Sequence, residues 1–450
     1  MNNGSYIKGA PQICLHCMSA YVVDGVCRNC GKPPTDENRS PNALPFGYRL
    51  QTPRNRLYLI GRVLGEGGFG ITYLAWDQAG RRPVALKELF PNRFSRAANM
   101  ELNVEPNQLS LFLHFKKRFL DEAHIISSLR NEPRIVNIYD YFELNGTGYY
   151  TMEYLRGTDM QHWIMRKQAP LTWKELESPI LQVLKGLSVL HGYGLIHRDI
   201  SPDNIFVCAD RQVKLIDFGS VRSANADHFT TILKQHYAPP EQLLADGNQG
   251  FWTDTYSLCA TIYYLLSGRL PAQSYNRVAA VKTGGTDPLV PLSQLNTAAP
   301  DYVLRAVMHG MNIDESSRFQ NVEEMRSALF PGTQREKSRP GSVIECVNGV
   351  YKGRHFVVAA GSYASLGRGE GSNAIPFPAN TPAVSRRHCV LYTHPSGKLY
   401  VQDQESRYGT FVDRRRIPPG RWIPLNPGQT FSIGNEQFVF KTPTMNGGKT

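Results

Sequence analysis

The sequence contains no run of about eighteen consecutive apolar residues, so it predicts no membrane-spanning helix. Its first residues, MNNGSYIKGAPQICLHC, lack the apolar core of a secretory signal. The 50 Lys and Arg residues outnumber the 38 Asp and Glu residues, but they form no long basic block. We therefore expect a cytoplasmic protein with a basic, solvated surface, and a dedicated nucleic-acid patch is the alternative.

Internal repeats and low-complexity tracts are also absent, but two polar breaks divide the chain. Prolines and polar residues predict linkers over residues 33–55 and 331–341. These linkers separate a short segment (12–32), a long region (56–330) and a C-terminal region (342–442). A chain of 450 residues is long enough for two or three domains, each with its own core.

Cysteine is absent between residues 31 and 207, yet CLHC and CRNC place Cys14, Cys17, Cys27 and Cys30 close together as two pairs. Two such knuckles present four thiolates, the tetrahedral set that Zn²⁺ favours, and the metal adds folding energy to a segment with little core. The stretch resembles the small zinc ribbons of bacterial proteins. We expect a closed, structural Zn²⁺ site; two disulfides or four free thiols are the alternatives.

The stretch LGEGGFGITYLAWD contains Gly65, Gly67 and Gly70 in the pattern G-x-G-x-x-G. Dinucleotide-binding folds share this pattern, but there a helix follows, whereas ITYLAW is β-branched and aromatic and predicts a strand. A strand, a glycine loop and a second strand let backbone N–H groups close over the phosphates of ATP. The next strand, VALKEL, carries Lys87.

Further motifs follow in order: RFLDEAHIISSL with Glu122 at a helical position, the strand YYTMEYL, the loop HRDISPDN, and then LIDFGS and YAPPEQ. With the glycine loop and VALKEL, they make residues 56–330 resemble a bacterial serine/threonine kinase of the eukaryotic type. The resemblance implies a multidomain chain with an α+β bilobal protein-kinase fold, its N-lobe over 56–152 and its C-lobe over 156–330.

The resemblance also implies cofactors and site residues, with ATP and Mg²⁺ (or Mn²⁺) as the cofactors. The catalytic residues would be Lys87, Glu122, Asp199, Asn204 and Asp217; the ATP contacts would be Gly65, Gly67, Gly70, Lys87 and the backbone of Glu153 and Leu155; the metal ligands would be Asn204 and Asp217. Asp199 would accept the proton of the substrate hydroxyl. Asp254 would steady the catalytic loop, and Arg318 would pair with Glu241.

The loop HRDISPDN departs from the family at Ser201, where a lysine usually stands two residues after the aspartate. That lysine neutralises charge on the transferring phosphoryl group. Seven residues before Glu241, where the family has a threonine, this chain has Lys234. We therefore predict that Lys234 is a catalytic residue that supplies the missing cation; the alternative is a lysine that points to solvent.

From residue 342 onward, short strands alternate with turn signals, as in an antiparallel β-sandwich. Within them, LGRG, SRRH and SRYGTFVD resemble the motifs of a forkhead-associated (FHA) domain, an all-β reader of phosphothreonine. The resemblance implies that Arg368, Ser385 and Arg387 bind the phosphate, with Arg386 as another source of charge. A generic sandwich with a solvated basic face is the alternative.

Two positions of this region depart from the FHA pattern, in which His388 and Gly409 would be structural. Tyr408 and Asp413 stand where the family usually has asparagines. At Tyr408, the chain lacks the asparagine side chain that would hold the backbone of a bound phosphopeptide.

Taken together, the motifs predict a kinase that transfers the γ-phosphate of ATP to protein Ser or Thr hydroxyls. We expect autophosphorylation at Thr230 or Thr231, because Arg198 precedes the catalytic aspartate and can pair with a phosphate there. The expected partners are protein substrates and phosphothreonine proteins, including another copy's activation segment; we expect no nucleic acid and no membrane span. The alternatives are a pseudokinase scaffold that only reads phosphothreonine and a nucleic-acid-associated kinase.

Overall fold

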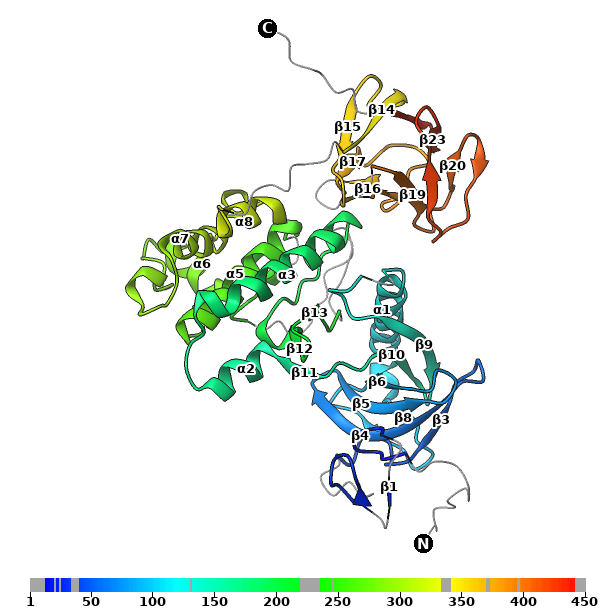
Figure 1. Cartoon of the computed structure of the whole chain (residues 1–450), viewed down its shortest axis with the longest axis vertical. Coiled ribbons are helices and arrows are strands. Elements are labelled where there is room, and N and C mark those ends of the chain that lie inside the picture. Colours follow the sequence, from blue (N-terminus) through cyan, green and yellow to red (C-terminus); the bar gives the residue numbers. More distant parts are fainter. Residues whose placement is uncertain are drawn as a thin grey trace. The chain divides into compact units, whose positions relative to one another are not determined.

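The computed structural model describes residues 13–19, 22–23, 26–33, 40–129, 132–218, 235–244, 247–332, 341–369, 373–394 and 397–441. The chain divides into two compact units, Met1–Arg156 and Gly157–Thr450. In Figure 1 the first unit runs from blue to cyan and the second from green to red. Within the described residues, no helix is long and apolar enough to cross a membrane.

A six-stranded antiparallel sheet forms the core of the first unit (Figure 1). In sheet order its strands are β3 (Arg49–Gln51), β4 (Leu57–Gly67), β5 (Gly70–Asp77), β6 (Arg82–Leu89), β10 (Thr147–Glu153) and β9 (Ile138–Leu144). Helix α1 (Leu109–Ser127) packs against β9 and β10. Tyr58, Ile60 and Tyr149 are fully buried, so the apolar face of the sheet is covered, as strands rich in β-branched and aromatic residues require.

The cysteine-containing segment packs directly on this sheet. It includes the short strands β1 (Val22–Val23) and β2 (Val26–Cys27). The backbone N–H of Arg62, in β4, donates to Leu15 O at 3.0 Å, and Arg62 Nε donates to His16 O at 2.9 Å. A Cβ atom at Gly61 would lie 2.2 Å from Leu15 O, so only glycine allows this approach. The register of β4 against β5 shifts at this point.

Residues 40–51 are also packed on the first unit, although the composition of residues 33–55 predicted a flexible linker. Ala43 and Leu44 are buried, and Leu44 N donates to the Tyr73 hydroxyl at 3.0 Å. Strand β3 ends the stretch and pairs with β4. Apolar side chains spaced among prolines and polar residues anchor residues 40–51, which the overall polarity of the stretch did not reveal.

Helices form the first part of the second unit (Figure 1). They are α2 (Met160–Lys167), α3 (Trp173–Gly192), α4 (Pro240–Leu243), α5 (Phe251–Ser267), α6 (Ser274–Lys282), α7 (Asp301–Gly310) and α8 (Val322–Leu329). Thr172 begins α3 with a capping box, in which its hydroxyl and the Glu175 carboxylate each bind the other residue's backbone N–H. Strands β11 (Gly157–Asp159), β12 (Ile205–Cys208) and β13 (Val213–Leu215) form a small antiparallel sheet beside them.

Two sheets form the sandwich at the end of the chain, as the alternation of strands and turns predicted. One contains, in order, β15 (His355–Val358), β14 (Ser342–Asn348), β24 (Glu436–Lys441), β23 (Thr430–Ile433), β20 (Thr410–Val412) and β21 (Arg415–Arg416). The other contains β17 (Ile375–Phe377), β16 (Tyr363–Arg368), β18 (Cys389–Thr393), β19 (Leu399–Asp403) and β22 (Ile423–Leu425). The pairing of β16 with β17 is parallel, unlike the antiparallel pattern that was expected.

Candidate functional site

The glycine motif forms the turn of a hairpin, as predicted. Strands β4 and β5 stay paired up to Gly67 and Gly70. A Cβ atom at Gly70 would lie 2.4 Å from Glu88 O, so this glycine lets β6 approach. Nothing lies within 4 Å of a Cβ position at Gly65 or Gly67. These two glycines leave open space beside the loop backbone, which a phosphate group needs to reach its N–H groups.

Lys87, Glu122 and Glu153 lie on the same sheet or on its helix, and Leu155 follows the end of β10. Lys87 is half-buried on β6, where it pairs across the sheet with Thr72 and Tyr150. Glu122 is buried on α1, the helix that packs against β10. Glu153 lies at the end of β10, and its carboxylate accepts the Asn137 backbone N–H at 3.2 Å. Pairing of Lys87 with Glu122 stays a prediction.

Beside Lys87 lies Glu88, a fully buried carboxylate that the motifs did not identify. Its Oε2 accepts the Tyr73 hydroxyl at 2.7 Å and Arg96 Nη2 at 2.7 Å, and its Oε1 accepts the Tyr149 hydroxyl. Burial acts to lower the pKa of Arg96, but the contact with Glu88 outweighs it and raises that pKa. Arg96 lies in residues 88–115, an insertion between Lys87 and Glu122 that matches no motif, and it supplies the cation that neutralises Glu88.

In the second unit, Asp254 holds the catalytic loop in place, as predicted. This fully buried carboxylate accepts the backbone N–H groups of His197 at 2.9 Å and Arg198 at 2.8 Å, and it lies 2.8 Å from His191 Nε2. Burial acts to raise the pKa of Asp254, but these hydrogen bonds and the nearby histidines hold it below its ordinary value. Asp254 is therefore charged at neutral pH.

The loop brings the predicted base and the predicted metal ligands together. Asn204 Nδ2 donates to Asp199 Oδ2 and to Asp199 O, both at 2.8 Å. Ile205 pairs with Leu215, and Ile216 N donates to Asn204 O at 3.1 Å, so Asn204 and Asp217 lie at the same end of the β12–β13 hairpin. Asp217 has a positive φ of 59°. An amide oxygen and a carboxylate are the hard oxygen ligands that Mg²⁺ prefers.

Ser201, the residue that departs from the family, is fully buried, and its carbonyl accepts the Asn204 backbone N–H at 3.0 Å. Lys234, Thr230 and Thr231 lie outside the described residues. The catalytic role of Lys234 and the phosphorylation of Thr230 or Thr231 therefore stay predictions.

The ion pair predicted for the end of the activation segment is confirmed. Arg318 Nη1 and Nη2 bind Glu241 Oε1 and Oε2 at 2.8 and 3.1 Å, with both side chains buried. Thr253 Oγ1 donates to Glu241 Oε1 at 3.0 Å and links the pair to α5. A bidentate, buried pair of this kind fixes the position of the residues on either side of it.

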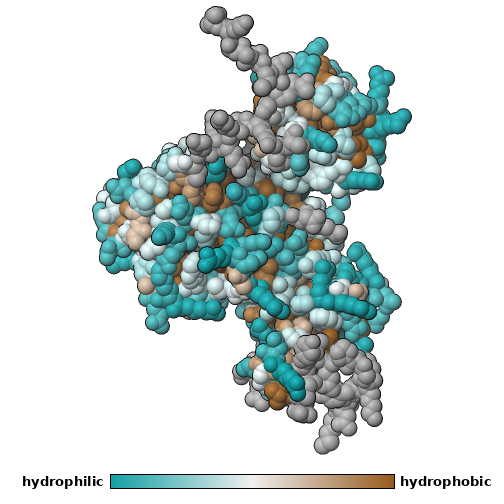
Figure 2. Space-filling model, viewed as in Figure 1, coloured by the Kyte–Doolittle hydropathy of each residue, from teal (hydrophilic) through white to brown (hydrophobic). Residues whose placement is uncertain are grey.

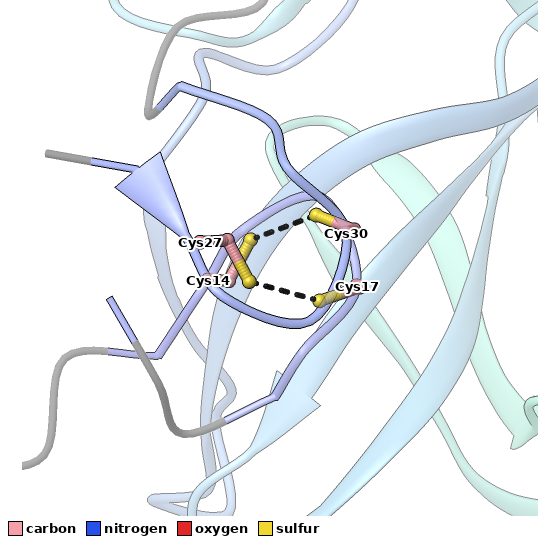
Figure 3. Close-up of side chains that lie close together, drawn as sticks. All are labelled: Cys14, Cys17, Cys27 and Cys30. Carbon is pink, nitrogen blue, oxygen red and sulfur yellow. Dashed lines mark hydrogen bonds between the residues drawn. The ribbon is translucent and has the colours of Figure 1, made fainter. Parts of the chain in front are cut away.

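The four N-terminal cysteines converge, as Figure 3 shows. Sγ of Cys14 and Cys30 lie 3.7 Å apart, and Sγ of Cys17 and Cys27 lie 3.6 Å apart. Zinc–sulfur bonds of about 2.3 Å in a tetrahedron put sulfur atoms about 3.8 Å apart, so the spacing fits the metal. All four are free cysteines, so the disulfide alternative is not what the structure contains.

The thiols of this cluster differ in acidity. Burial raises the pKa of Cys14 to about 12. Burial also acts to raise the pKa of Cys17, but hydrogen bonds with Ser19 and Asn29 lower it to about 6. A bound divalent cation would be the largest local charge and would favour the thiolate form of every ligand.

The predicted phosphothreonine residues meet at one end of the sandwich. Arg368 ends β16, and its backbone N–H donates to Ser385 O at 3.1 Å. Ser385 N donates to His388 Nδ1 at 3.0 Å, so His388 Nε2 carries the hydrogen and donates to Gly409 O at 3.1 Å. His388 and Gly409 are therefore structural, as expected. Ser385 Oγ accepts the Arg407 backbone N–H at 3.1 Å, which leaves its hydroxyl hydrogen to donate elsewhere.

Arg387 differs from the other predicted phosphate ligands. It is half-buried, its Nη2 donates to Gln404 Oε1 at 3.1 Å, and burial lowers its pKa to about 10. Its neighbour Arg386 is exposed.

These geometries agree with what the sequence matches. Residues 58–305 match the protein kinase domain, and residues 364–434 match the FHA domain. Because the first match covers more than half of the chain, the chain belongs to the protein kinase family, and it also carries an FHA domain. The four-cysteine cluster precedes both.

The relatives are bacterial serine/threonine kinases. Serine/threonine-protein kinase F of Synechocystis sp. is 34% identical over 237 residues, which cover 49% of this chain and 45% of the relative. Serine/threonine-protein kinase PrkC of Bacillus subtilis is 30% identical over 276 residues, which cover 60% and 40%. The chain thus spans less than half the length of these two relatives. The solved structure "PpkA-294 apo form" has a TM-score of 0.55 and 28% identity, covering 64% of this chain and 99% of that one.

Proposed function

We propose that this chain is an active protein kinase that transfers the γ-phosphate of ATP to Ser and Thr hydroxyls of proteins. The observation that carries the proposal is the catalytic loop: Asn204 holds Asp199, Asp217 lies at the same hairpin end, and the buried Asp254 fixes the backbone before them. A pseudokinase scaffold would have no need to retain all of these groups. The motif residues and the bacterial relatives favour Ser and Thr as acceptors.

In this proposal each group has one task. Asp199 accepts the proton of the substrate hydroxyl, and its position depends on the Asn204 amide. Asn204 and Asp217 would hold Mg²⁺, which neutralises the charge of the ATP phosphates when it is bound. Lys87 would hold the α- and β-phosphates, and the backbone of Glu153 and Leu155 would hold adenine.

Incubation of the protein with labelled ATP and Mg²⁺, followed by mass-spectrometric mapping, tests the proposal. We expect phosphoserine or phosphothreonine, with Thr230 or Thr231 among the sites, and loss of all sites in Asp199→Asn. Phosphates that are equally abundant in Asp199→Asn would show that another source had added them.

Lys234 is proposed to supply the cation that Ser201 cannot. Removing one group that stabilises charge in a transition state typically costs on the order of a hundredfold in turnover. Lys234→Ala should therefore lower kcat strongly with little change in the KM for ATP, and Ser201→Lys with Lys234→Thr should recover part of the loss. Unchanged turnover in Lys234→Ala would show that Lys234 is only a surface residue.

The cysteine cluster is proposed to bind one structural Zn²⁺ per chain. The support is the fit of the sulfur spacing to tetrahedral coordination. Metal analysis should find one zinc in the wild type and much less in Cys14→Ser and Cys27→Ser. Equal zinc in all three would refute this site.

The four reduced thiols and the use of ATP also support a cytoplasmic location for the protein.

The FHA domain is proposed to bind phosphothreonine through Arg368 and Ser385, with Arg387 or Arg386 adding charge. The partners would be phosphorylated proteins, including the activation segment of another copy. Arg368→Ala should abolish binding of a phosphothreonine peptide.

A further inference from the structure

The FHA domain is more basic than its phosphate site requires. Residues 342–441 contain nine Arg and three Lys against six Asp and Glu. Three of those six carboxylates are bound internally: Asp403 accepts the Ser406 and Thr410 hydroxyls, Asp413 accepts Thr430 N, and Glu436 accepts Val350 N. The domain therefore carries six more basic than acidic side chains (12 against 6), and three of the six carboxylates face partners within the fold.

Part of this charge lies next to the proposed phosphate site. Arg407 lies next to Ser385, because its backbone N–H donates to the Ser385 hydroxyl oxygen at 3.1 Å. Two residues on, a Cβ atom at Gly409 would lie 2.4 Å from Arg416 Nε. Arg416 belongs to β21, which pairs with β20. One continuous path thus runs from the phosphate site to the β20–β21 hairpin.

We define the basic strip as Arg407, Arg414, Arg415 and Arg416. All four are exposed, and within the described part of the chain none forms an ion pair. Arg407 lies 5.6 Å from the ring centroid of Tyr408, an aromatic residue that is 53% exposed. Figure 2 shows hydrophilic side chains on the sandwich between smaller apolar patches. Two exposed carboxylates lie close in sequence: Asp413, whose oxygens accept Thr430 N and Gln429 Nε2, and Glu405.

We propose that the basic strip binds anionic groups that flank the phosphothreonine in the recognised peptide, either carboxylates or a second phosphate. This rests on the proposed phosphothreonine site. Tyr408 stands where an asparagine would hold the peptide backbone, so charge pairing at the strip takes over part of the selection. Guanidinium groups suit both carboxylates and phosphates, because they present paired N–H donors.

The test uses fluorescence anisotropy with the full chain and four labelled peptides of one length. One carries phosphothreonine with neutral flanks, one adds three glutamates, one adds a second phosphothreonine, and one has the glutamates without phosphate. The strip variant is Arg415→Ser with Arg416→Ser. The charge-matched control is Lys352→Ser with Arg354→Ser, which lie at the turn into β15, at the opposite edge of the same sheet.

For the wild type and the control, we expect glutamates or a second phosphate to tighten binding about three- to tenfold, the value of one or two exposed ion pairs. The strip variant should lose this gain and bind the neutral phosphopeptide unchanged. A gain from the glutamates or from the second phosphate that survives in the strip variant would overturn the proposal. If Arg368→Ala binds the neutral phosphopeptide normally, it is the phosphothreonine site itself that fails.

Discussion

Glu88 and Asp254 are both fully buried carboxylates, one in each unit, but their partners differ in kind. Glu88 is held by side chains, two tyrosine hydroxyls and the Arg96 guanidinium. Asp254 is held by two backbone N–H groups of the catalytic loop and by His191. A carboxylate bound to backbone fixes the course of a loop, whereas one bound to side chains fixes how neighbouring elements pack. Asp254 should therefore matter most for turnover, and Glu88 most for stability.

The largest effect is expected for Arg96→Met, which leaves the charge of Glu88 buried without its cation. Breaking a buried pair by removing one partner costs about 3–5 kcal/mol of unfolding free energy. Chemical denaturation measures this, with Arg93→Met as the control, because Arg93 is an exposed arginine of the same insertion. Equal midpoints for the two variants would show that Tyr73 and Tyr149 suffice for Glu88.

Asp254→Asn should act on catalysis instead. Misplacing the loop that carries Asp199 by about 1 Å can cost on the order of a hundredfold in kcat. The KM for ATP should change little, since Lys87 and the glycine loop are untouched. The matched control is Asp287→Asn. It breaks a different ion pair, that of Asp287 Oδ2 with Arg277 Nη2 at 2.7 Å, and within the described residues Asp287 accepts no hydrogen bond from the catalytic loop. If both variants lost turnover alike, the loss would reflect folding and not loop position.

Gly61→Ala tests how firmly the cysteine segment is joined to the first unit. A Cβ atom there would lie 2.2 Å from Leu15 O and 2.3 Å from Met18 Cε, so the segment must move. Such overpacking typically costs about 1–3 kcal/mol. Zinc content should stay at wild-type level, because no ligand is changed. Gly332→Ala, with nothing within 4 Å of its Cβ position, is the control. Wild-type stability in Gly61→Ala would show that the contact is loose.

The smallest effect concerns Glu175, in the capping box of α3. The hydrogen bond from Lys167, followed by those with Thr172, lowers the pKa of Glu175 to about 2. Because the folded-state pKa lies below the ordinary value, the carboxylate stabilises the fold above pH 4.5 and loses this contribution as the pH falls towards 2. Glu175→Gln keeps a capping-box acceptor but loses the ion pair with Lys167, so it should lower the unfolding free energy by about 0.5 kcal/mol at pH 7. The difference from wild type should shrink below pH 4.5; a constant difference would mean that charge is not involved.

The contacts of Asp254 could be predicted from the sequence, whereas the contact of Glu88 with Arg96 could not. The roles of Asp254 and of the Glu241–Arg318 pair follow from the resemblance to protein kinases, and the hairpin around the glycine motif follows from the β-branched and aromatic residues after it. Arg96 lies in an insertion that matches no motif, so only the folded chain reveals that it meets Glu88. A glutamate inside the apolar strand VALKEL was the one signal, because a buried carboxylate needs a partner.

The same limit applies to the stretch before β3 and to the sandwich. Proline and polar residues hid the anchoring side chains Ala43 and Leu44, which become visible only through their burial. In the sandwich, strand positions followed from alternation, but the parallel pairing of β16 with β17 depends on a chain reversal that alternation does not encode.

The most direct test of the account is the steady-state rate of phosphoryl transfer from ATP and Mg²⁺ to a generic protein substrate. Wild type should turn over at a rate typical of kinases, on the order of 1–100 s⁻¹ on a good substrate, and Asp199→Asn should fall to background. ATP binding by the two proteins, measured alongside, should be similar. Wild type that binds ATP and Mg²⁺ but transfers phosphate no faster than Asp199→Asn would contradict the kinase assignment and leave a phosphothreonine-reading scaffold.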